Sequence, residues 1–470
     1  MPRKPLAVPF FTSRYTRLEL ISILVFMFWI LAFGTTKYPK YVPMAFMGLC
    51  LLLLFFLLGP YVGFCIYFLT TFFRTISLPG GAVSLNQVIG IMFVVSWLNW
   101  FFRGKVRFPK GPLAILFTIL FIYFMVNCFV AVDFEEGLFH ARYVAIYFFI
   151  ALALASVIRK KEDYHTIFWI ILISSFLSSL IGAFELISGM DVLTKAGAVW
   201  MGRRRINGAA PNSIVFAYQL LYAFPVGYYL FSEAKSFRSR FLALGLSIFI
   251  TVIALFTFNR QTIILVGFIY LVTAFLFRNR YSKIFTGTVV ILMLILSPYI
   301  LHLVWSRMQT IGGIKGDTSL TLRIDGLKVG ANMLRKHPFM GVGLGCYHIM
   351  WWKYLPLGET RILQYLRSTT RYPDMCYNQL LAEGGLIGFT LAVGFFLILF
   401  RSLWIGRKKA KDCKDRRSLN LYACFILMMS IFLLSSFIQD TFLYVRTWIM
   451  FGLMLASLHG IVKERKKGEG

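Results

Sequence analysis

The sequence is poor in charged residues, and acidic residues are the scarcest of them. Charged side chains make up 14% of the 470 residues, and 19 aspartates and glutamates stand against 49 lysines and arginines. Because soluble domains carry about 25% charged residues, this composition excludes an ordinary soluble protein. The 7 cysteines are odd in number, scattered and mostly inside apolar runs. They predict neither a disulfide framework nor a metal-binding motif.

Apolar side chains take the place of the missing charge. Hydrophobic residues make up 59% of the chain and aromatic residues 17%. Apolar runs of about 17–25 residues recur from Leu18 to Val462, the length that an α-helix needs to cross the hydrocarbon of a bilayer. Backbone groups cannot face lipid unpaired, and the alternation of a membrane β-barrel is absent. We therefore predict an all-α polytopic membrane protein, a single transmembrane domain over residues 1–470 with about 12–14 helices.

The basic residues indicate which loops share one side of the membrane. The net charge of +30 would fit a nucleic-acid-binding protein, but the charges form short clusters between apolar runs. Such clusters are typical of cytoplasmic loops, so we expect no nucleic-acid partner. The clusters are 101–110, 159–164, 233–240, 278–283, 407–417 and the C-terminal tail. Two apolar runs separate each cluster from the next. Earlier runs near 18–36, 41–58, 60–75 and 83–101 place the N-terminus on the same side, so both termini are predicted to be cytoplasmic.

The remaining loops then face outward, and several carry arginines. These loops are 133–141, 187–211, the turn at Asn259-Arg260, the long segment 305–376 and the turn near Asp440. In "ALFTFNRQTIILVGF" (254–268), Arg260 is the one charge between two apolar runs. An arginine kept on the outer face indicates a bound anion. The alternative is that Arg260 reaches toward lipid headgroups.

The long segment 305–376 has a helical pattern of its own. "TSLTLRIDGLKVGANMLRKHPFMGVGLG" places apolar residues at helical spacing with basic residues between them, which predicts an amphipathic helix ended by His337-Pro338. Ordered loops of this length usually carry function, although a surface cap without chemistry is the alternative. After it, "RYPDMCYNQLLAEGGLIG" enters the next crossing. Asp374 is a candidate helix cap or a cavity-lining group, and Glu383 is too deep for capping, which leaves a buried carboxylate paired with an arginine as its simplest interpretation.

Four motifs, in this order, resemble those of the O-antigen ligase and polymerase (Wzy/WaaL-type) family of membrane glycosyltransferases. They are "RRRINGAAPNSIVFAYQLL", "LFTFNRQTIILVG", "SLTLRIDGLKVGANMLRKHPFMGVGLGCY" and "DMCYNQLLAEGGLIG". The similarity covers residues 195–400, which we take as the family-like catalytic region. Asn259 stands where the family has a serine, and Asp374 stands where it has a histidine. The spacing between Gly208 and Pro211-Asn212 is also short.

The resemblance implies a GT-C-like helical fold with a large external loop at 305–376. It also implies a reaction in which a glycan passes from an undecaprenyl-diphosphate-linked oligosaccharide to an acceptor hydroxyl on the outer face of the bacterial inner membrane. Arginines suit the diphosphate because they are always protonated and bind in a bidentate manner. The acceptor hydroxyl needs a base, for which Asp374 is the first candidate and His337 and His348 are the alternatives. The predicted diphosphate ligands are Arg260, Arg205 and Arg323, and the predicted lining residues are Asn212, Tyr377, Asn378 and Glu383.

Polymerases and ligases share this architecture, and the missing histidine favours a polymerase of O-antigen or exopolysaccharide repeat units. A ligase that joins the glycan to lipid A-core is the alternative, and a non-enzymatic flippase is a more distant one. A flippase would show charges at midplane depth in several helices and internal repeats, whereas here the charges gather at outer helix ends. We expect no cofactor and no metal. The expected partners are lipid-linked donor and acceptor, membrane lipid and a chain-length regulator.

Overall fold

The computed structural model describes most of the chain after residue 59. The described residues are 60–71, 85–106, 108–158, 160–189, 199–200, 203–210, 212–257, 259–277, 318–355, 375–437, 439–442 and 444–468, with helical positions between 283 and 298. The predicted runs at 18–36 and 41–58 lie outside them. The statements below concern this described part.

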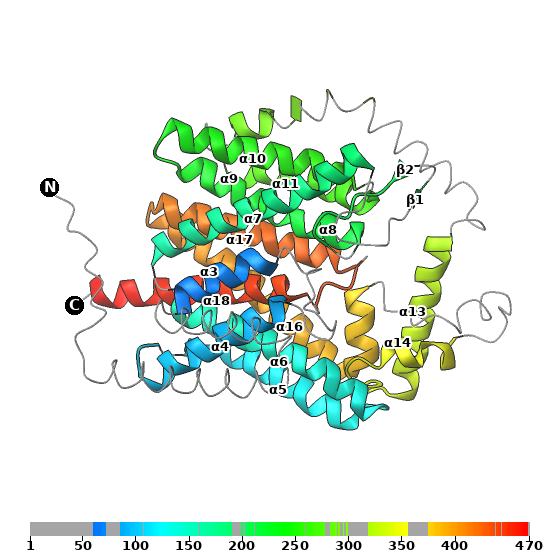
Figure 1. The fold of residues 1–470 in the computed structure, drawn as a ribbon. Coiled ribbons are helices and arrows are strands. Elements are labelled where there is room, and N and C mark those ends of the chain that lie inside the picture. The colour runs from blue at the N-terminus through cyan, green and yellow to red at the C-terminus, as the bar shows by residue number, and fades with distance from the viewer. Residues whose placement is uncertain are drawn as a thin grey trace, which may run out of the picture.

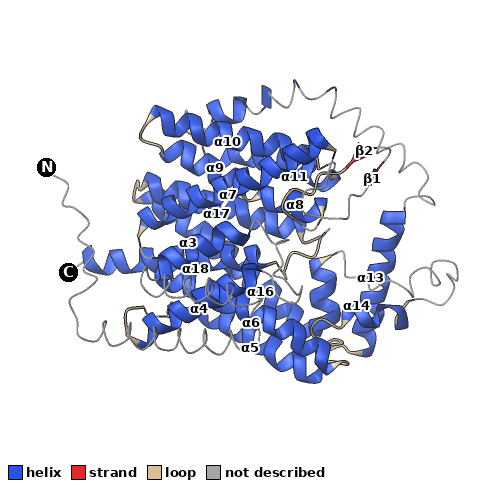
Figure 2. Cartoon of the chain, in the orientation of Figure 1, coloured by secondary structure: helices blue, strands red, loops and turns tan. Residues whose placement is uncertain are grey.

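Helices make up nearly all of the regular structure (Figure 2). The first half of the chain forms α3 (Pro60–Thr71), α4 (Leu85–Phe102), α5 (Pro112–Asn127), η2 (Cys128–Val130), α6 (Phe134–Val157), α7 (Lys161–Ser188), α8 (Ser213–Leu221) and α9 (Ala223–Glu233). The second half forms α10 (Phe237–Leu255), α11 (Arg260–Leu276), α13 (Thr318–Lys336), α14 (Tyr347–Met350), η3 (Trp351–Lys353), α16 (Cys376–Asp412), α17 (Arg416–Ser435) and α18 (Val445–Gly468). One antiparallel pair joins β1 (Val199–Trp200) to β2 (Arg203–Arg204).

Seven of the described helical segments are long and apolar enough to cross a membrane, and four shorter apolar helices accompany them. The predicted all-α polytopic membrane fold is thereby confirmed. The helices line up in one bundle (Figure 1). Segment α8–α9 and helix α17 are buried almost all round, so they form the centre of the bundle. Helix α5 instead exposes Ile115, Ile119 and Ile122 on one stripe, the apolar face that lipid contact requires.

One end of the bundle collects the basic segments. Figure 1 shows the connections α4–α5, α6–α7, α9–α10 and α16–α17 at the same end as the C-terminus. Ion pairs hold two of them together: Lys161 Nζ lies 2.6 Å from Asp415 Oδ2, and Arg417 Nη1 lies 2.6 Å from Glu162 Oε1. We call this the basic end (residues 101–106, 160–164, 233–240 and 407–417). These segments are the ones that the sequence places on one side of the membrane.

The opposite end collects the segments predicted to face the other side. It contains the start of α6, the β1–β2 pair and the starts of α8, α11 and α16, together with α13 and α14 (Figure 1). Backbone hydrogen bonds join segments far apart in sequence here: Val132 N donates to Val342 O at 3.0 Å, and Cys376 N donates to Ser436 O at 3.0 Å. We call this the loop end (residues 131–141, 185–189, 203–213, 259–261, 318–355, 375–387 and 435–442).

The predicted amphipathic helix is present as α13, which ends at Lys336 immediately before His337-Pro338. Its buried face carries Val329 and Met333, whereas Leu327 is exposed. Together with the turn that follows and α14, it has a small apolar core separate from that of the bundle. The core consists of Val329, Met333, Val342, Cys346, Tyr347, Met350, Trp351 and Ala382. This loop module (residues 318–355) is therefore a packed unit joined to α16.

Candidate functional site

A kink near the start of α16 organises the loop end. Gly385 has φ 59° and ψ −164°, a conformation essentially reserved for glycine. The kink frees two amides for the segment after α13. Leu386 N donates to Pro338 O at 2.9 Å, and Ile387 N donates to Phe339 O at 3.2 Å. A Cβ on Gly385 would lie 2.4 Å from Phe339 O, so the close approach also needs the glycine.

The glycine turn after α13 fits against this kink. Gly341, Gly343 and Gly345 have φ of +69°, +98° and +76°. Val342 N donates to Ala382 O at 2.9 Å, and Gly343 N donates to the backbone oxygen of Glu383 at 3.1 Å. The "HPFMGVGLG" motif therefore docks on "EGGLIG" by main-chain hydrogen bonds, and its glycines are needed for positive φ.

Glu383 lies beneath this junction and is 3% exposed. Its Oε1 accepts a hydrogen bond from Tyr347 N at 3.2 Å, and its Oε2 accepts one from Gln379 Nε2 at 3.2 Å. Within the described part of the chain its partners are therefore amides, where the sequence analysis expected an arginine. The carboxylate accepts a hydrogen bond from the first amide of α14, which positions the loop module.

Asn378 and Tyr377 connect α16 to its neighbours. Asn378 Nδ2 donates to Gly326 O at 2.8 Å, and the Tyr347 hydroxyl donates to the same oxygen at 3.0 Å. A Cβ on Gly330 would lie 1.9 Å from Asn378 Oδ1, so α13 lies directly on Asn378. The Tyr377 hydroxyl donates to Leu433 O at 3.1 Å on α17.

The two candidate histidines have different surroundings. His337 is partly exposed at the end of α13, with Nε2 3.0 Å from the Tyr354 hydroxyl. His348 is 7% exposed on α14, and its Nε2 lies 3.4 Å from Glu136 Oε1. The first candidate base, Asp374, lies outside the described residues.

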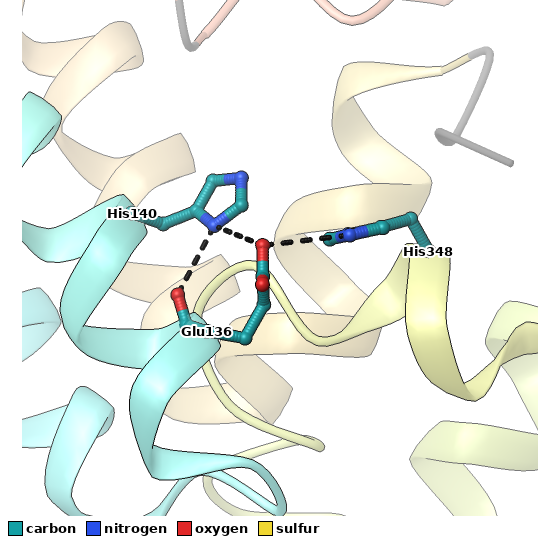
Figure 3. A group of neighbouring side chains, drawn as sticks. All are labelled: Glu136, His140 and His348. Carbon is teal, nitrogen blue, oxygen red and sulfur yellow. Dashed lines mark hydrogen bonds and ion pairs between the residues drawn. The ribbon is translucent and has the colours of Figure 1, made fainter. Parts of the chain in front are cut away.

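A carboxylate and two imidazoles meet at the start of α6 (Figure 3). Glu136 and His140 lie one turn apart on α6, with His140 Nδ1 3.2 Å from Glu136 Oε1, and His348 approaches the same oxygen from α14. One ligand atom from each residue lies within 4.8 Å of the other two. We call these three residues the Glu136 cluster. Among the described residues, this group could hold a metal ion.

Of these three residues, the sequence predicted a role for His348 but not for Glu136 or His140. The segment 133–141 was predicted to face outward, but no chemistry was assigned to it. Its usable signal is the Glu-x-x-x-His spacing of Glu136 and His140, which puts both side chains on one face of a helix. The approach of His348 depends on tertiary packing.

The predicted arginines lie on different elements of the loop end. Arg205 follows β2 and precedes Asn207 and Gly208, whose amides each donate to Glu185 Oε2 at 2.8 Å on α7. Arg323 lies on α13 and is partly exposed.

Arg260 is the first residue of α11, as the predicted turn requires, and its side chain lies outside the described part. Asn259 precedes it as the N-cap, with its side chain accepting from Gln261 N at 3.2 Å. Gln261 Nε2 donates a hydrogen bond to Ser435 O at 3.3 Å. The backbone oxygen of the next residue, Ser436, accepts a hydrogen bond from Cys376 N. The starts of α11 and α16 therefore meet at the end of α17.

Asn212 is the N-cap of α8, and its Oδ1 accepts from Val215 N at 2.8 Å. Figure 1 shows α8 with the β1–β2 pair on one part of the loop end and α13 with α14 on another. The helix starts place the positive ends of their dipoles at this end, and together with the arginines these are groups that can interact with an anion.

Comparison with known families agrees with the last three of the four motifs. Residues 244–393 match the family described as O-antigen ligase. The matched segment runs from α10 to α16, so it includes the Asn259–Arg260 turn, α13, the glycine turn and the kink. The predicted resemblance to the Wzy/WaaL-type family is confirmed. A search of curated proteins finds no match.

Proposed function

We propose that this protein is a polymerase of lipid-linked polysaccharide repeat units, acting on the outer face of the bacterial inner membrane. The observation that carries the proposal is the position of the family match. The segment that matches the O-antigen ligase family, 244–393, contains the start of α11, α13, α14 and the start of α16, which form a large part of the loop end. A membrane glycosyltransferase of this type must handle a lipid carrier and a polar glycan at one membrane surface, and the loop end offers polar groups above apolar helices.

The donor in this proposal is a glycan on undecaprenyl diphosphate. Its departure leaves negative charge on the diphosphate, which guanidinium groups stabilise as always-protonated, bidentate donors. Arg260 is the central ligand in this assignment, because it begins α11 at the loop end, where the first amides of the helix also favour an anion. Arg205 and Arg323 contribute from neighbouring segments, and the transfer step itself requires no metal.

The acceptor hydroxyl requires a base or an orienting acceptor. We assign this role to Asp374, in the segment that leads into α16. His337 is the alternative that the structure favours over His348, because His337 is partly exposed, whereas His348 is buried beside Glu136. Asn212, Tyr377, Asn378 and Glu383 shape the surroundings through the hydrogen bonds described above.

Polymerase and ligase differ in what accumulates when the protein is absent. We expect a strain that lacks it to accumulate single repeat units on the lipid carrier. Long chains on the carrier would instead identify a ligase, and repeat units retained at the cytoplasmic face would identify a transporter. Complementation with the wild-type protein must restore the normal profile, and it serves as the control.

A further inference from the structure

The Glu136 cluster has the dimensions of a metal site. Glu136 Oε1 lies 3.2 Å from His140 Nδ1 and 3.4 Å from His348 Nε2, and the three ligand atoms lie within 4.8 Å of one another. Zinc–nitrogen bonds of about 2.0–2.1 Å in a tetrahedron place neighbouring ligand atoms about 3.3–3.4 Å apart. Two edges of the triangle therefore already have the required length.

We propose that Glu136, His140 and His348 bind one divalent transition-metal ion of the zinc class at the loop end. Two imidazole nitrogens and one carboxylate oxygen are ligands that Zn²⁺ accepts readily, whereas Mg²⁺ and Ca²⁺ prefer oxygen alone. Three protein ligands leave one tetrahedral position for water. The site does not depend on the proposed transferase activity.

The surroundings hold the three ligands in place. The side chain of His140 is 11% exposed and that of His348 is 8% exposed, whereas that of Glu136 is 28% exposed and gives an ion a route from solvent. Gly345 packs so closely that a Cβ there would lie 2.2 Å from His140 Nδ1. The hydrogen bond from Tyr347 N to Glu383 Oε1 fixes the residue next to His348. The cluster therefore joins α6 to the loop module through two largely buried histidines and one partly exposed carboxylate.

The local charge also favours a cation. In a chain with 19 acidic and 49 basic residues, Asp133, Glu135 and Glu136 fall within four positions. Asp133 is already used as the N-cap of α6, where its side chain accepts from Glu136 N at 3.1 Å. Cys346 lies nearby, but its thiol donates to Asp133 O, with Sγ 3.5 Å from that oxygen. The ligand atoms that lie within 4.8 Å of one another are those of Glu136, His140 and His348, which form the ligand set.

The same distances are also those of hydrogen bonds, which defines the competing explanation. A carboxylate oxygen can accept from two imidazole N–H groups, and His140 Nδ1 also lies 3.1 Å from its own helix carbonyl at Glu136 O. To bind an ion, the His140 ring must direct the lone pair of Nδ1 toward the carboxylate side. Metal binding then occupies His348 and removes it from the candidate bases.

The test measures metal content on intact protein purified in detergent with a tag free of histidine. After treatment with a chelator and equilibration with Zn²⁺ followed by gel filtration, we expect about one ion per chain in the wild type. His348→Ala and Glu136→Gln should each reduce this to near zero. His337→Ala is the matched control, since it removes a histidine of the same module outside the cluster and should retain the ion.

Two further readouts guard against misfolded variants. Zn²⁺ should raise the unfolding temperature of the wild type and of His337→Ala, and leave that of His348→Ala unchanged. Co²⁺ added to the wild type should give visible absorption bands of a tetrahedral or five-coordinate ion, which needs no variant. Wild-type protein without bound Zn²⁺, or equal content in wild type and His348→Ala, would overturn the proposal and leave a hydrogen-bonded cluster.

Discussion

Arginine and lysine bind a diphosphate with different geometry, and this difference allows the proposed role of Arg260 to be tested. Lysine carries a compact point charge, whereas the guanidinium group presents a planar fork that matches two phosphate oxygens. A residue that only reaches toward lipid headgroups needs charge alone. At a residue that clamps the leaving group, the fork itself contributes to transition-state stabilisation.

We therefore expect Arg260→Lys and Arg260→Ala both to reduce transfer strongly, by about 10²-fold or more, with expression near normal. Initial rates of glycan transfer, normalised to protein in the membrane, provide the measurement. Arg238→Ala is the control, because Arg238 is exposed at the basic end and should be close to wild type. Full activity in Arg260→Ala would leave lipid anchoring as the role of this side chain.

The base is tested by a substitution that removes proton transfer and keeps the size of the side chain. The N-cap of α16 is Met375. Asparagine is close to aspartate in size but cannot take a proton, so Asp374→Asn should lower the rate by about 10²–10⁴-fold if Asp374 is the base. His337→Ala should retain most activity. The opposite pattern, with Asp374→Asn active and His337→Ala dead, would move the base to His337 at the end of α13.

At the level of single residues, the sequence predicted local relations better than tertiary ones. It placed Arg260 at a turn and His337 at a helix end, because both follow from short-range signals. It did not identify Glu136 and His140, since their link to His348 spans more than two hundred positions. It also expected an arginine beside Glu383, where the described part of the chain provides amides.

Among the elements, α13 and α16 show what a pattern can and cannot reveal. The start and end of α13 follow from helical spacing and from the proline that stops it. In α16, the kink at Gly385 lies where the polar start of the helix passes into its apolar run, with no proline to mark it. Adjacent glycines are compatible with a straight helix, and the kink is favoured here because the glycine turn supplies partners for the freed amides.

The kink gives a prediction about stability with an internal control. Gly385→Ala forces a side chain into a glycine-only conformation and against Phe339 O, so we expect a loss of about 1–3 kcal/mol in the free energy of unfolding. Gly394→Ala lies in the same helix with open space around its Cβ, and alanine there should be neutral or stabilise by up to about 1 kcal/mol. Thermal unfolding of both variants in one detergent provides the comparison. Equal stability of the two would contradict the role of the kink.

On the scale of the whole molecule, the alternation of basic clusters predicted which segments share an end. The structure places 101–106, 160–164, 233–240 and 407–417 together at the basic end, and the described parts of the predicted outward segments lie at the loop end. Charge distribution relative to the membrane is a global property, so it survives uncertainty about single helix boundaries. The side of the membrane that each end faces is a separate prediction.

Cysteine labelling in intact cells tests that prediction with a native reporter. Cys413 is exposed and free at the basic end, so a membrane-impermeant thiol reagent should leave it unmodified from outside. A cysteine at Phe339, which is 68% exposed at the loop end, should be modified. Permeabilised cells provide the control in which both react. Labelling of Cys413 in intact cells would reverse the orientation and remove the basis for an outward-facing site.

In the proposed function, the loop end transfers a glycan from a lipid diphosphate onto a growing chain. The most direct test of this function is chain length, measured with purified protein and defined undecaprenyl-diphosphate-linked repeat units. We predict a ladder of lengthened glycans with the wild type and single units with Arg260→Ala. A folded wild-type protein that leaves the repeat units unjoined would contradict the proposed polymerase function, and an Arg260→Ala protein that gives the same ladder would contradict the role of Arg260.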